Sequence, residues 1–200
     1  MTNKEKISIF GFSANPPANH HLSIIQGLTR VFDRVIVIPR GTSSNKTSTA
    51  TTTTGQRMDM VKLIFSPFPD LKIDLNDLDN NIFTPTWMID EKYKKLFPNS
   101  EVWHAVGGDL IEGGKDGNSE IQKIWQKGNE IWQSLNWAVI DHKAHPISKT
   151  DLPPKNLLVT IEKIGGRSTI IRNRVALDQS ISEFVPQVIE KYIKQNDLYN

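Results

Sequence analysis

Residues 6–25 read KISIFGFSANPPANHHLSII, and the expected architecture follows from this stretch. Lys6–Phe10 is short, β-branched and followed by Gly11, which predicts a buried strand that ends at a loop. From Asn19 to Phe32 apolar side chains recur at spacings of three and four, which predicts an amphipathic helix. The loop between them therefore joins the carboxyl end of a first strand to the amino end of a first helix.

The alternation of strand and helix continues along the chain. Arg34–Pro39 (RVIVIP) is an almost continuous aliphatic run, typical of a central parallel strand that is covered on both faces. Further strands are predicted at 71–75, 101–106, 137–141 and 157–161, and helices at 56–65, 86–96, 120–135 and, as a short and then a longer helix, within 168–195. The fold class is therefore α/β, a Rossmann-like open parallel sheet with helices on both faces.

Length and composition favour one domain spanning residues 1–200. The 24 basic and 22 acidic side chains give a net charge of +2, and this near-balance argues against a nucleic-acid-binding protein. Hydrophobic residues make up 38%, enough for a real core. Residues 41–55 (GTSSNKTSTATTTTG) are nearly all Ser, Thr and small residues, so we expect a mobile loop there.

Several protein classes are disfavoured by what the sequence lacks. There is no cysteine, which excludes disulfides, thiolate metal sites and a cysteine nucleophile and makes the cytoplasm the expected compartment. No run approaches the roughly 18 apolar residues of a membrane helix. The first ten residues, MTNKEKISIF, show no signal-peptide cleavage pattern. We therefore expect neither a membrane nor a nucleic acid as a partner.

The loop after the first strand is the first candidate for a binding site, because ligands of open α/β sheets bind at the carboxyl ends of the strands. The helix that follows begins with Asn19, His20 and His21. Backbone N–H groups at a helix start attract anions, and imidazoles in the first turn can add donors to a phosphate. A helix cap or a solvated histidine pair is the alternative.

The second candidate is VGGDLIEGG, residues 106–114, after a middle strand. Gly107 and Gly108 allow a ligand to approach the backbone closely, and Asp109 can accept hydrogen bonds from ribose hydroxyls. Ordinary turn chemistry is the alternative for this loop.

The third candidate is GGRSTIIRNRV, residues 165–175, after the last strand. Ser168 and Thr169 stand where a helix should begin, and Arg172 follows about one turn later. Hydroxyls, N–H groups and a guanidinium together suit a polyphosphate. A capped basic surface helix is the alternative.

Taken together, the three loops resemble the nucleotidyltransferases of the HxGH type, and within them the bacterial nicotinate mononucleotide adenylyltransferases. In those enzymes the loops read approximately GGTFDPxHxGH, GxDSL and ISSTxIR; here they read GFSANPPANHHL, GGDLI and GRSTIIR. The resemblance extends to Val185-Pro186 and to Leu198-Tyr199, so it spans almost the whole chain.

The first motif departs from the family pattern at two positions. Ala18 stands where the family has its first His or Thr, and His20 stands where it has glycine; His21 matches. Arg167 replaces the first serine of the third motif. Helical geometry puts Ala18 and His21 on one face and turns His20 about 100° away from His21.

The resemblance implies transfer of the adenylyl group of ATP to nicotinate mononucleotide, which yields the deaminated dinucleotide and pyrophosphate. Because the acceptor phosphate attacks the α-phosphorus directly, the protein supplies positioning and charge stabilisation. Mg²⁺ is expected as a cofactor that arrives with ATP, and no residue of the chain is assigned as a metal ligand.

The resemblance also implies roles for particular residues. His21 and Arg172 are the expected catalytic residues, with His21 on the α and β phosphates. The expected ATP-binding residues are Gly11, Phe12, Ser13, His21, Gly107, Asp109, Ser168, Thr169 and Arg172. The expected acceptor-binding residues are Lys46, Thr86, Trp87 and Trp125. Lys46 would bind the acceptor phosphate and the two tryptophans would stack on the pyridine ring, although core burial is the alternative for any of the five tryptophans.

Three alternatives stay open at this point. A related nucleotidyltransferase could use another phosphorylated acceptor, such as phosphopantetheine. Ala18 and His20 motivate a non-catalytic nucleotide sensor. A dinucleotide-binding oxidoreductase is disfavoured, because the first loop lacks GxGxxG and Pro39 and Arg40 stand where an acidic ribose ligand would follow the second strand. The preference for nicotinate over nicotinamide mononucleotide and the oligomeric state are not decided by the sequence.

Overall fold

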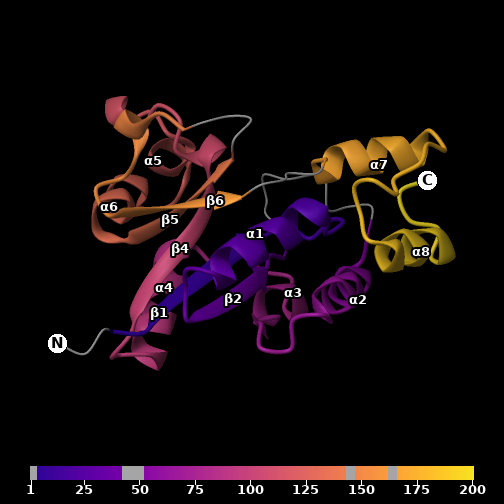
Figure 1. Ribbon diagram of the computed structural model, residues 1–200, viewed down its shortest axis with the longest axis horizontal. Coiled ribbons are helices and arrows are strands. Elements are labelled where there is room, and N and C mark those ends of the chain that lie inside the picture. The colour runs from indigo at the N-terminus through magenta and orange to yellow at the C-terminus, as the bar shows by residue number, and fades with distance from the viewer. Residues whose placement is uncertain (1–3, 42–51, 143–146, 162–165) are drawn as a thin grey trace. The chain divides into compact units, whose positions relative to one another are not determined.

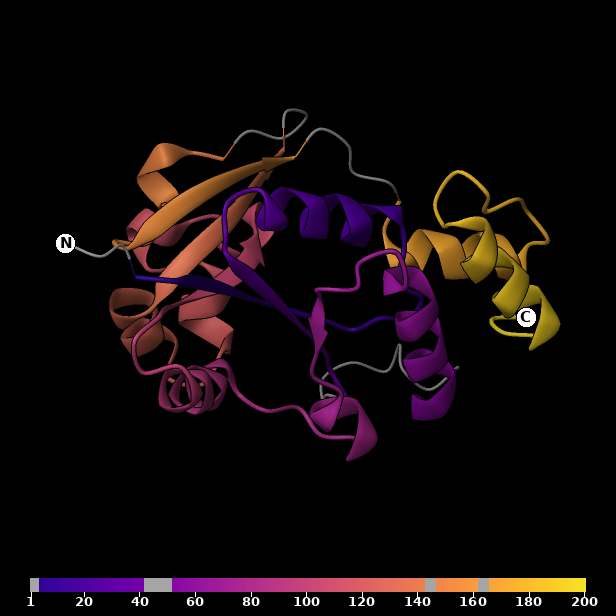
Figure 2. The same ribbon diagram turned by 60° about the horizontal axis from the view of Figure 1, so that its bottom comes forward.

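A computed structural model describes residues 4–41, 52–142, 147–161 and 166–200 (Figures 1 and 2). The strands are β1 (Lys6–Phe12), β2 (Arg34–Pro39), β3 (Lys72–Ile73), β4 (Glu101–Gly107), β5 (Asn136–His142) and β6 (Asn156–Ile161). The α-helices are α1 (Asn19–Thr29), α2 (Thr54–Phe65), α3 (Asn76–Asp79), α4 (Thr86–Leu96), α5 (Glu120–Ile124), α6 (Gly128–Ser134), α7 (Ser168–Ala176) and α8 (Gln187–Gln195). Short 3₁₀ helices are η2 (Gly108–Leu110), η3 (Gly114–Asp116) and η4 (Lys149–Asp151). No described helix has the length and apolar character needed to span a membrane.

The strands form a six-stranded sheet in the order β3-β2-β1-β4-β5-β6. The pairs β1·β4, β4·β5 and β5·β6 are parallel. This is the doubly wound order, and the direction of strand addition reverses between β1 and β4. The predicted α/β class is confirmed.

The chain divides into two compact units. The first unit comprises Met1–Phe10, Gln26–Ile36 and Thr84–Glu162, and the second comprises Gly11–Ile25, Val37–Phe83 and Lys163–Asn200. The middle candidate loop belongs to the first unit, whereas the first and third candidate loops belong to the second.

In the first unit helices cover both faces of the strands. On one face Val106 of β4 lies opposite Val139 of β5, and both join a buried cluster with Ile121 of α5 and Trp132 of α6. On the other face a Cβ added to Gly27 of α1 would lie 2.6 Å from a methyl carbon of Ile161. Glycine therefore allows the end of α1 to pack directly onto β6.

In the second unit α2 lies against α8, as Figure 1 shows. Met60 and Val61 of α2 and Ile189 and Ile193 of α8 are fully or almost fully buried. The hydroxyl of Tyr192 donates a hydrogen bond to the carboxylate of Asp59 across the two helices, at 2.9 Å. The two helices therefore pack against each other through buried apolar side chains.

The structure corrects two boundaries near the first loop. The strand predicted to stop before Gly11 continues to Phe12, because the carbonyl of Phe12 accepts a hydrogen bond from the N–H of Arg40 (2.8 Å). The helix predicted to reach Phe32 ends at Thr29, where the N–H of Val31 bonds to the carbonyl oxygen of Leu28, three residues back, in a tighter closing turn (3.0 Å).

The helix predicted at 120–135 is two helices, α5 and α6. Lys127 between them adopts the left-handed conformation, with φ 56°. A Cβ on Gly128 would lie 2.2 Å from the carbonyl oxygen of Ile121, so the chain packs back onto α5. The apolar periodicity spans both helices, and for that reason the sequence did not reveal the break.

Smaller corrections concern α2, β3 and the last helices. α2 begins at Thr54, because Thr53 and Gln56 form a capping box. The strand predicted at 71–75 is only two residues long. α7 and α8 have nine residues each, so the second is not longer, and Phe184 precedes it. Residues 42–51 of the predicted mobile loop lie outside the described residues.

Candidate functional site

The first loop, Ser13–Ala18, is anchored to the protein by hydrogen bonds from the buried side chain of Arg57. The guanidinium of Arg57 donates to the carbonyl oxygen of Ser13, with Nε at 3.1 Å, and also to the carbonyl oxygen of Arg40. Only 1% of Arg57 is exposed. Burial lowers the pKa of Arg57, but a guanidinium keeps its charge in a protein. A fixed positive charge therefore joins the loop to the end of β2.

The C-terminal segment also contacts the first loop, through the side chain of Tyr199. Asn15 is buried, and its side-chain oxygen accepts hydrogen bonds from the hydroxyls of Tyr199 (2.7 Å) and Thr52 (2.9 Å). Burial raises the pKa of Tyr199, so the phenol is protonated and can donate. The side chain of Asn15 thus links the first loop to Tyr199 and Thr52.

Helix α7 brings the third candidate loop onto the first. Ser168 Oγ donates to the carbonyl oxygen of Pro16 (2.9 Å), and Arg172 Nη1 donates to that of Asn15 (2.7 Å). Arg172 Nη2 also lies 3.3 Å from Thr169 Oγ1. α7 begins at Ser168, where the sequence predicted a helix start. Three predicted ATP-binding residues are therefore assembled beside the first loop.

His21 is a neutral hydrogen-bond donor in this arrangement. The N–H of Ala18 donates to His21 Nδ1 at 3.0 Å, so the proton of the neutral imidazole is on Nε2. Burial lowers the pKa of His21 well below its ordinary value, and the neighbouring His20 lowers it further. Ala18 lies just before α1, and the bond joins its backbone N–H to the His21 ring, so the predicted shared face of the two side chains stays a prediction.

The predicted separation of His20 from His21 is wrong. Their ring centroids are 3.7 Å apart, because the two side chains fold together in the first turn of α1. Burial lowers the pKa of His20 to about 4, although a hydrogen bond to the backbone of Gly166 opposes the shift. Its Nδ1 is buried without a hydrogen-bond partner among the described residues. Histidine at this position therefore carries a desolvation cost that glycine would avoid.

A second buried guanidinium, that of Arg40, lies near Gly11 in the second unit. Arg40 lies beside Gly11, since a Cβ added there would be 3.6 Å from the Arg40 side chain. Arg40 Nη1 pairs with the buried carboxylate of Asp77 at 3.1 Å, and its guanidinium stacks 4.2 Å from the centroid of Phe83. Phe12 is buried against His21, with ring centroids 4.6 Å apart.

Sequence reasoning assigned no role to Arg57 or Arg40. A signal existed for Arg57, since it shares the inward face of α2 with Val61 and Ile64 at helical spacing. No comparable signal exists for Arg40, because its partner Asp77 is 37 residues away.

The middle loop belongs to the first unit. β4 ends at Gly107, and a Cβ there would lie 2.5 Å from a carboxylate oxygen of Asp109, so Asp109 folds back over Gly107. Asp109 is exposed. A Cβ on Gly108 would lie 2.7 Å from the side chain of Ile147. The second glycine therefore allows Ile147 to pack closely against the backbone, and the close ligand approach expected at these glycines stays a prediction.

The first unit also brings together the two predicted stacking residues. Trp87 and Trp125 are half-buried and pack on the cluster around Trp132 and Trp137; we call this pair the tryptophan platform. The rings of Trp125 and Trp137 meet edge to face, with centroids 6.2 Å apart. Lys127 Nζ lies 4.0 Å from the centroid of Trp87. Trp132 and Trp137 are buried in the core, whereas Trp87 and Trp125 are half-buried against it.

The other predicted acceptor residues have different outcomes. Thr86 is half-buried at the first position of α4, next to Trp87. Lys46 lies outside the described residues. Among the residues that the structure describes, no group of three or more His, Asp or Glu side chains is arranged to hold a metal ion.

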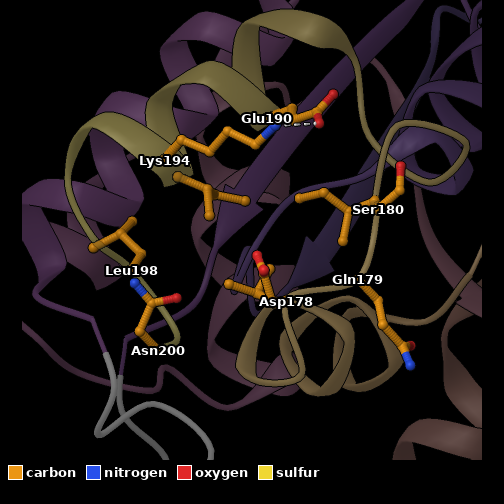
Figure 3. A pocket seen from close by; sticks show the side chains of 10 residues that line it. Asp178, Gln179, Ser180, Glu190, Lys194, Leu198 and Asn200 are labelled. Carbon is orange, nitrogen blue, oxygen red and sulfur yellow. Dashed lines mark hydrogen bonds and ion pairs between the residues drawn. The ribbon is translucent and has the colours of Figure 1, made fainter.

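The second unit also contains a cavity of about 370 Å³ (Figure 3). It is lined by the end of α7, the following turn and α8, with Lys194 paired to Glu190 at 2.9 Å and with Asp178 at its wall. None of the residues predicted for ATP or the acceptor lines it.

Comparisons with known proteins agree with this architecture. The family model described as cytidylyltransferase-like matches residues 9–174. The nicotinate-nucleotide adenylyltransferase of Bacillus subtilis is 24% identical over 197 residues, covering 98% of both chains. A probable nicotinate-nucleotide adenylyltransferase of Borrelia garinii is 28% identical, covering 97% of this chain and 94% of its own.

A solved structure shows the same fold. The nicotinic acid mononucleotide adenylyltransferase of Plasmodium falciparum, complexed with NaAD, has a TM-score of 0.80 at 21% identity, covering 98% of this chain and 97% of its own. The family match includes all three candidate loops through Arg172, and the resemblance inferred from the motifs is confirmed. The chain belongs to the cytidylyltransferase-like family.

Proposed function

We propose that the protein is a nucleotidyltransferase that transfers the adenylyl group of ATP to nicotinate mononucleotide, with release of pyrophosphate. The observation that carries the proposal is the convergence of α7 on the first loop: Arg172 and Ser168 bond to consecutive carbonyls of that loop. A guanidinium, hydroxyls and the neutral His21 are thereby gathered in one unit as donors suited to phosphate oxygens. The relatives carry the same activity in their names.

In the proposed reaction a phosphate oxygen of the acceptor forms a bond to the α-phosphorus of ATP. The bond between that phosphorus and the oxygen bridging to the β-phosphate breaks, and the electron pair leaves with pyrophosphate. Arg172 stabilises the charge that develops on the departing group, and the Thr169 hydroxyl, which accepts from Arg172, donates to the same phosphates. The Ser168 hydroxyl proton is used on Pro16, so Ser168 would contribute its backbone N–H at the start of α7. A guanidinium has five N–H donors, so Arg172 can bind phosphate while it still holds Asn15.

His21 donates from Nε2 to the phosphates near the reacting centre. Because its Nδ1 is fixed by Ala18 and its pKa is lowered by burial, the imidazole stays neutral and keeps one orientation at pH 7. A preoriented neutral donor stabilises developing negative charge without the cost of reorganisation.

For ribose and pyridine binding, the proposal rests on residues of the first unit, and for the acceptor phosphate it rests on Lys46 of the second. The exposed carboxylate of Asp109 would accept hydrogen bonds from ribose hydroxyls beside Gly107. Trp87 and Trp125, with Thr86 beside them, would bind the pyridine ring, and Lys46 would bind the acceptor phosphate. The assignment of residues 1–200 to one catalytic domain is supported by the family match, which draws on both compact units.

Mg²⁺ is proposed to arrive with ATP. The groups beside the first loop are a guanidinium, hydroxyls and an imidazole that already accepts a hydrogen bond at Nδ1, and these suit phosphate oxygens better than a hard cation. Mg²⁺ bound to the triphosphate would neutralise part of its charge. For the compartment we propose the cytoplasm, which the cysteine-free composition favours.

A pyrophosphate-release assay tests the proposal. Purified protein with ATP and Mg²⁺ is given nicotinate mononucleotide, nicotinamide mononucleotide or phosphopantetheine in turn, and the fastest release is expected with nicotinate mononucleotide. Equal or zero rates with both pyridine mononucleotides contradict the proposal. Faster release with phosphopantetheine supports the other acceptor, and ATP binding without any turnover supports a sensor.

A further inference from the structure

Lys127 occupies an unusual position at the edge of the tryptophan platform. It is a non-glycine residue in the left-handed conformation, with φ 56° and ψ 31°, a backbone state that few such residues adopt. Its side chain is exposed, and its Nζ lies 4.0 Å from the centroid of the Trp87 ring. It forms no ion pair with a carboxylate in the described part of the chain. No described carboxylate therefore neutralises the charge of Lys127.

The turn that carries Lys127 is fixed on both sides. Trp125, two residues earlier, packs edge to face against the fully buried Trp137. Gly128, the next residue, lies so close to the Ile121 carbonyl that no larger residue fits. Because both neighbours are anchored, the ammonium group remains within reach of the platform while its four-carbon stem stays flexible.

The chemistry of the two pyridine mononucleotides makes this charge informative. The ring nitrogen is bonded to ribose and carries a positive charge in both molecules. In nicotinate mononucleotide the ring carboxylate cancels that charge, whereas in the nicotinamide form the neutral amide leaves the ring system cationic. An ammonium beside the ring therefore attracts the carboxylate of the first and repels the cationic ring of the second.

We infer that Lys127 is a specificity-determining residue that selects nicotinate over nicotinamide mononucleotide at the tryptophan platform. The inference rests on the proposed function, which assigns the pyridine ring to Trp87 and Trp125. Lys127 attracts nicotinate mononucleotide and repels nicotinamide mononucleotide. Both effects therefore raise the ratio of the two kcat/KM values in favour of nicotinate mononucleotide. The ammonium leaves the face of Trp87 when the pyridine ring stacks there and pairs with the carboxylate.

The test compares kcat/KM for the two mononucleotides at saturating ATP. In Lys127→Gln, which keeps the length of the side chain and removes the charge, the ratio of nicotinate to nicotinamide kcat/KM should fall about tenfold, mainly through KM. Lys127→Arg should keep the ratio within about threefold of wild type. Lys123→Gln, which removes an exposed charge from the nearby α5, is the matched control and should leave the ratio unchanged.

Calorimetric binding of each mononucleotide without ATP repeats the comparison independently of turnover. A wild type that turns over nicotinate mononucleotide, with a Lys127→Gln ratio within twofold of it, overturns the inference and leaves the proposed function intact. A wild type that turns over neither mononucleotide contradicts the proposed function. In that case, equal affinities of wild type and Lys127→Gln for nicotinate mononucleotide overturn the inference as well. Thermal unfolding shows whether each variant is folded.

Discussion

The first loop and the tryptophan platform are built in opposite ways. The first loop is held by buried polar side chains that donate to its carbonyls, above all Arg57 and Arg172. The platform rests on an apolar cluster whose members include the fully buried Trp137. The two regions should therefore respond differently to substitution. Loss of a donor from the first loop leaves a buried carbonyl unpaired, whereas the apolar cluster under the platform can repack.

This contrast also fits the ligands that each region is proposed to bind. Phosphates require directed donors and positive charge, which must be held in fixed positions to be useful. A pyridine ring requires a flat surface, and aromatic packing supplies it without directed bonds. Single substitutions should consequently be far more damaging in the first loop than on the platform.

The largest effect is expected for Arg172→Ala. It removes the guanidinium proposed to grip pyrophosphate, and the rate of adenylyl transfer should fall about 10³-fold, or about 4 kcal/mol in activation free energy. Pyrophosphate release measures the rate, and circular dichroism checks that the fold is intact. A steady-state rate within about threefold of wild type means that Arg172 does not carry this role.

Arg57→Met should reduce stability more than activity. It leaves the carbonyls of Ser13 and Arg40 without their donor, and we expect a loss of about 3 kcal/mol in the free energy of unfolding. Urea denaturation measures the loss. Arg34→Met is the control, because the exposed Arg34–Glu5 pair should contribute less than about 1 kcal/mol. Equal losses in the two variants would contradict the structural role of Arg57.

His21→Ala should lower the rate about 10²-fold, the usual scale for one lost transition-state donor. His20→Gly should stay within about threefold of wild type, because it removes a ring whose Nδ1 is buried without a partner among the described residues. Steady-state kinetics on both variants separates the two histidines. If His20→Gly abolished turnover and His21→Ala did not, the register of the motif would be wrong.

The two histidines also predict a loss of stability in mild acid. Their pKa values are lowered in the folded protein, to about 4 for His20, from about 6.5 in the unfolded chain. As pH falls below 6.5 the unfolded state takes up protons that the folded state does not bind, so stability decreases towards pH 4. Each histidine should contribute about 1.4 kcal/mol per pH unit in that window. Denaturation curves from pH 7.5 to 5 test this, and His20→Asn should reduce the slope.

The smallest effect is expected on the platform. Trp87→Phe keeps an aromatic face, so the unfolding free energy should change by at most about 1 kcal/mol and the acceptor KM should rise only about threefold. Acceptor titrations at saturating ATP measure the KM. A collapse of stability as large as that of Arg57→Met would remove the contrast between the two regions.

The predicted fold class came from local periodicity, which is a property of neighbouring residues. The aliphatic run of β2 and the helical spacing after Asn19 are visible in any short window, and the structure confirms both elements. The three loops were equally visible, because glycines, hydroxyls and arginines follow predicted strands at fixed offsets. The break between α5 and α6 was not visible in the sequence, since the apolar pattern of 120–135 continues through Lys127.

The sequence thus establishes which side chains are candidates, and tertiary contacts establish what each one touches. Tyr199 bonds to Asn15 across 184 residues, and Arg172 to the same residue across 157. No local pattern encodes such pairs, because they depend on how the elements pack and not on their own periodicity. The same reason explains why no local pattern indicates that Ile147 packs closely against Gly108. It also explains Lys127, which only the packing of α5, α6 and Trp87 brings onto an aromatic ring.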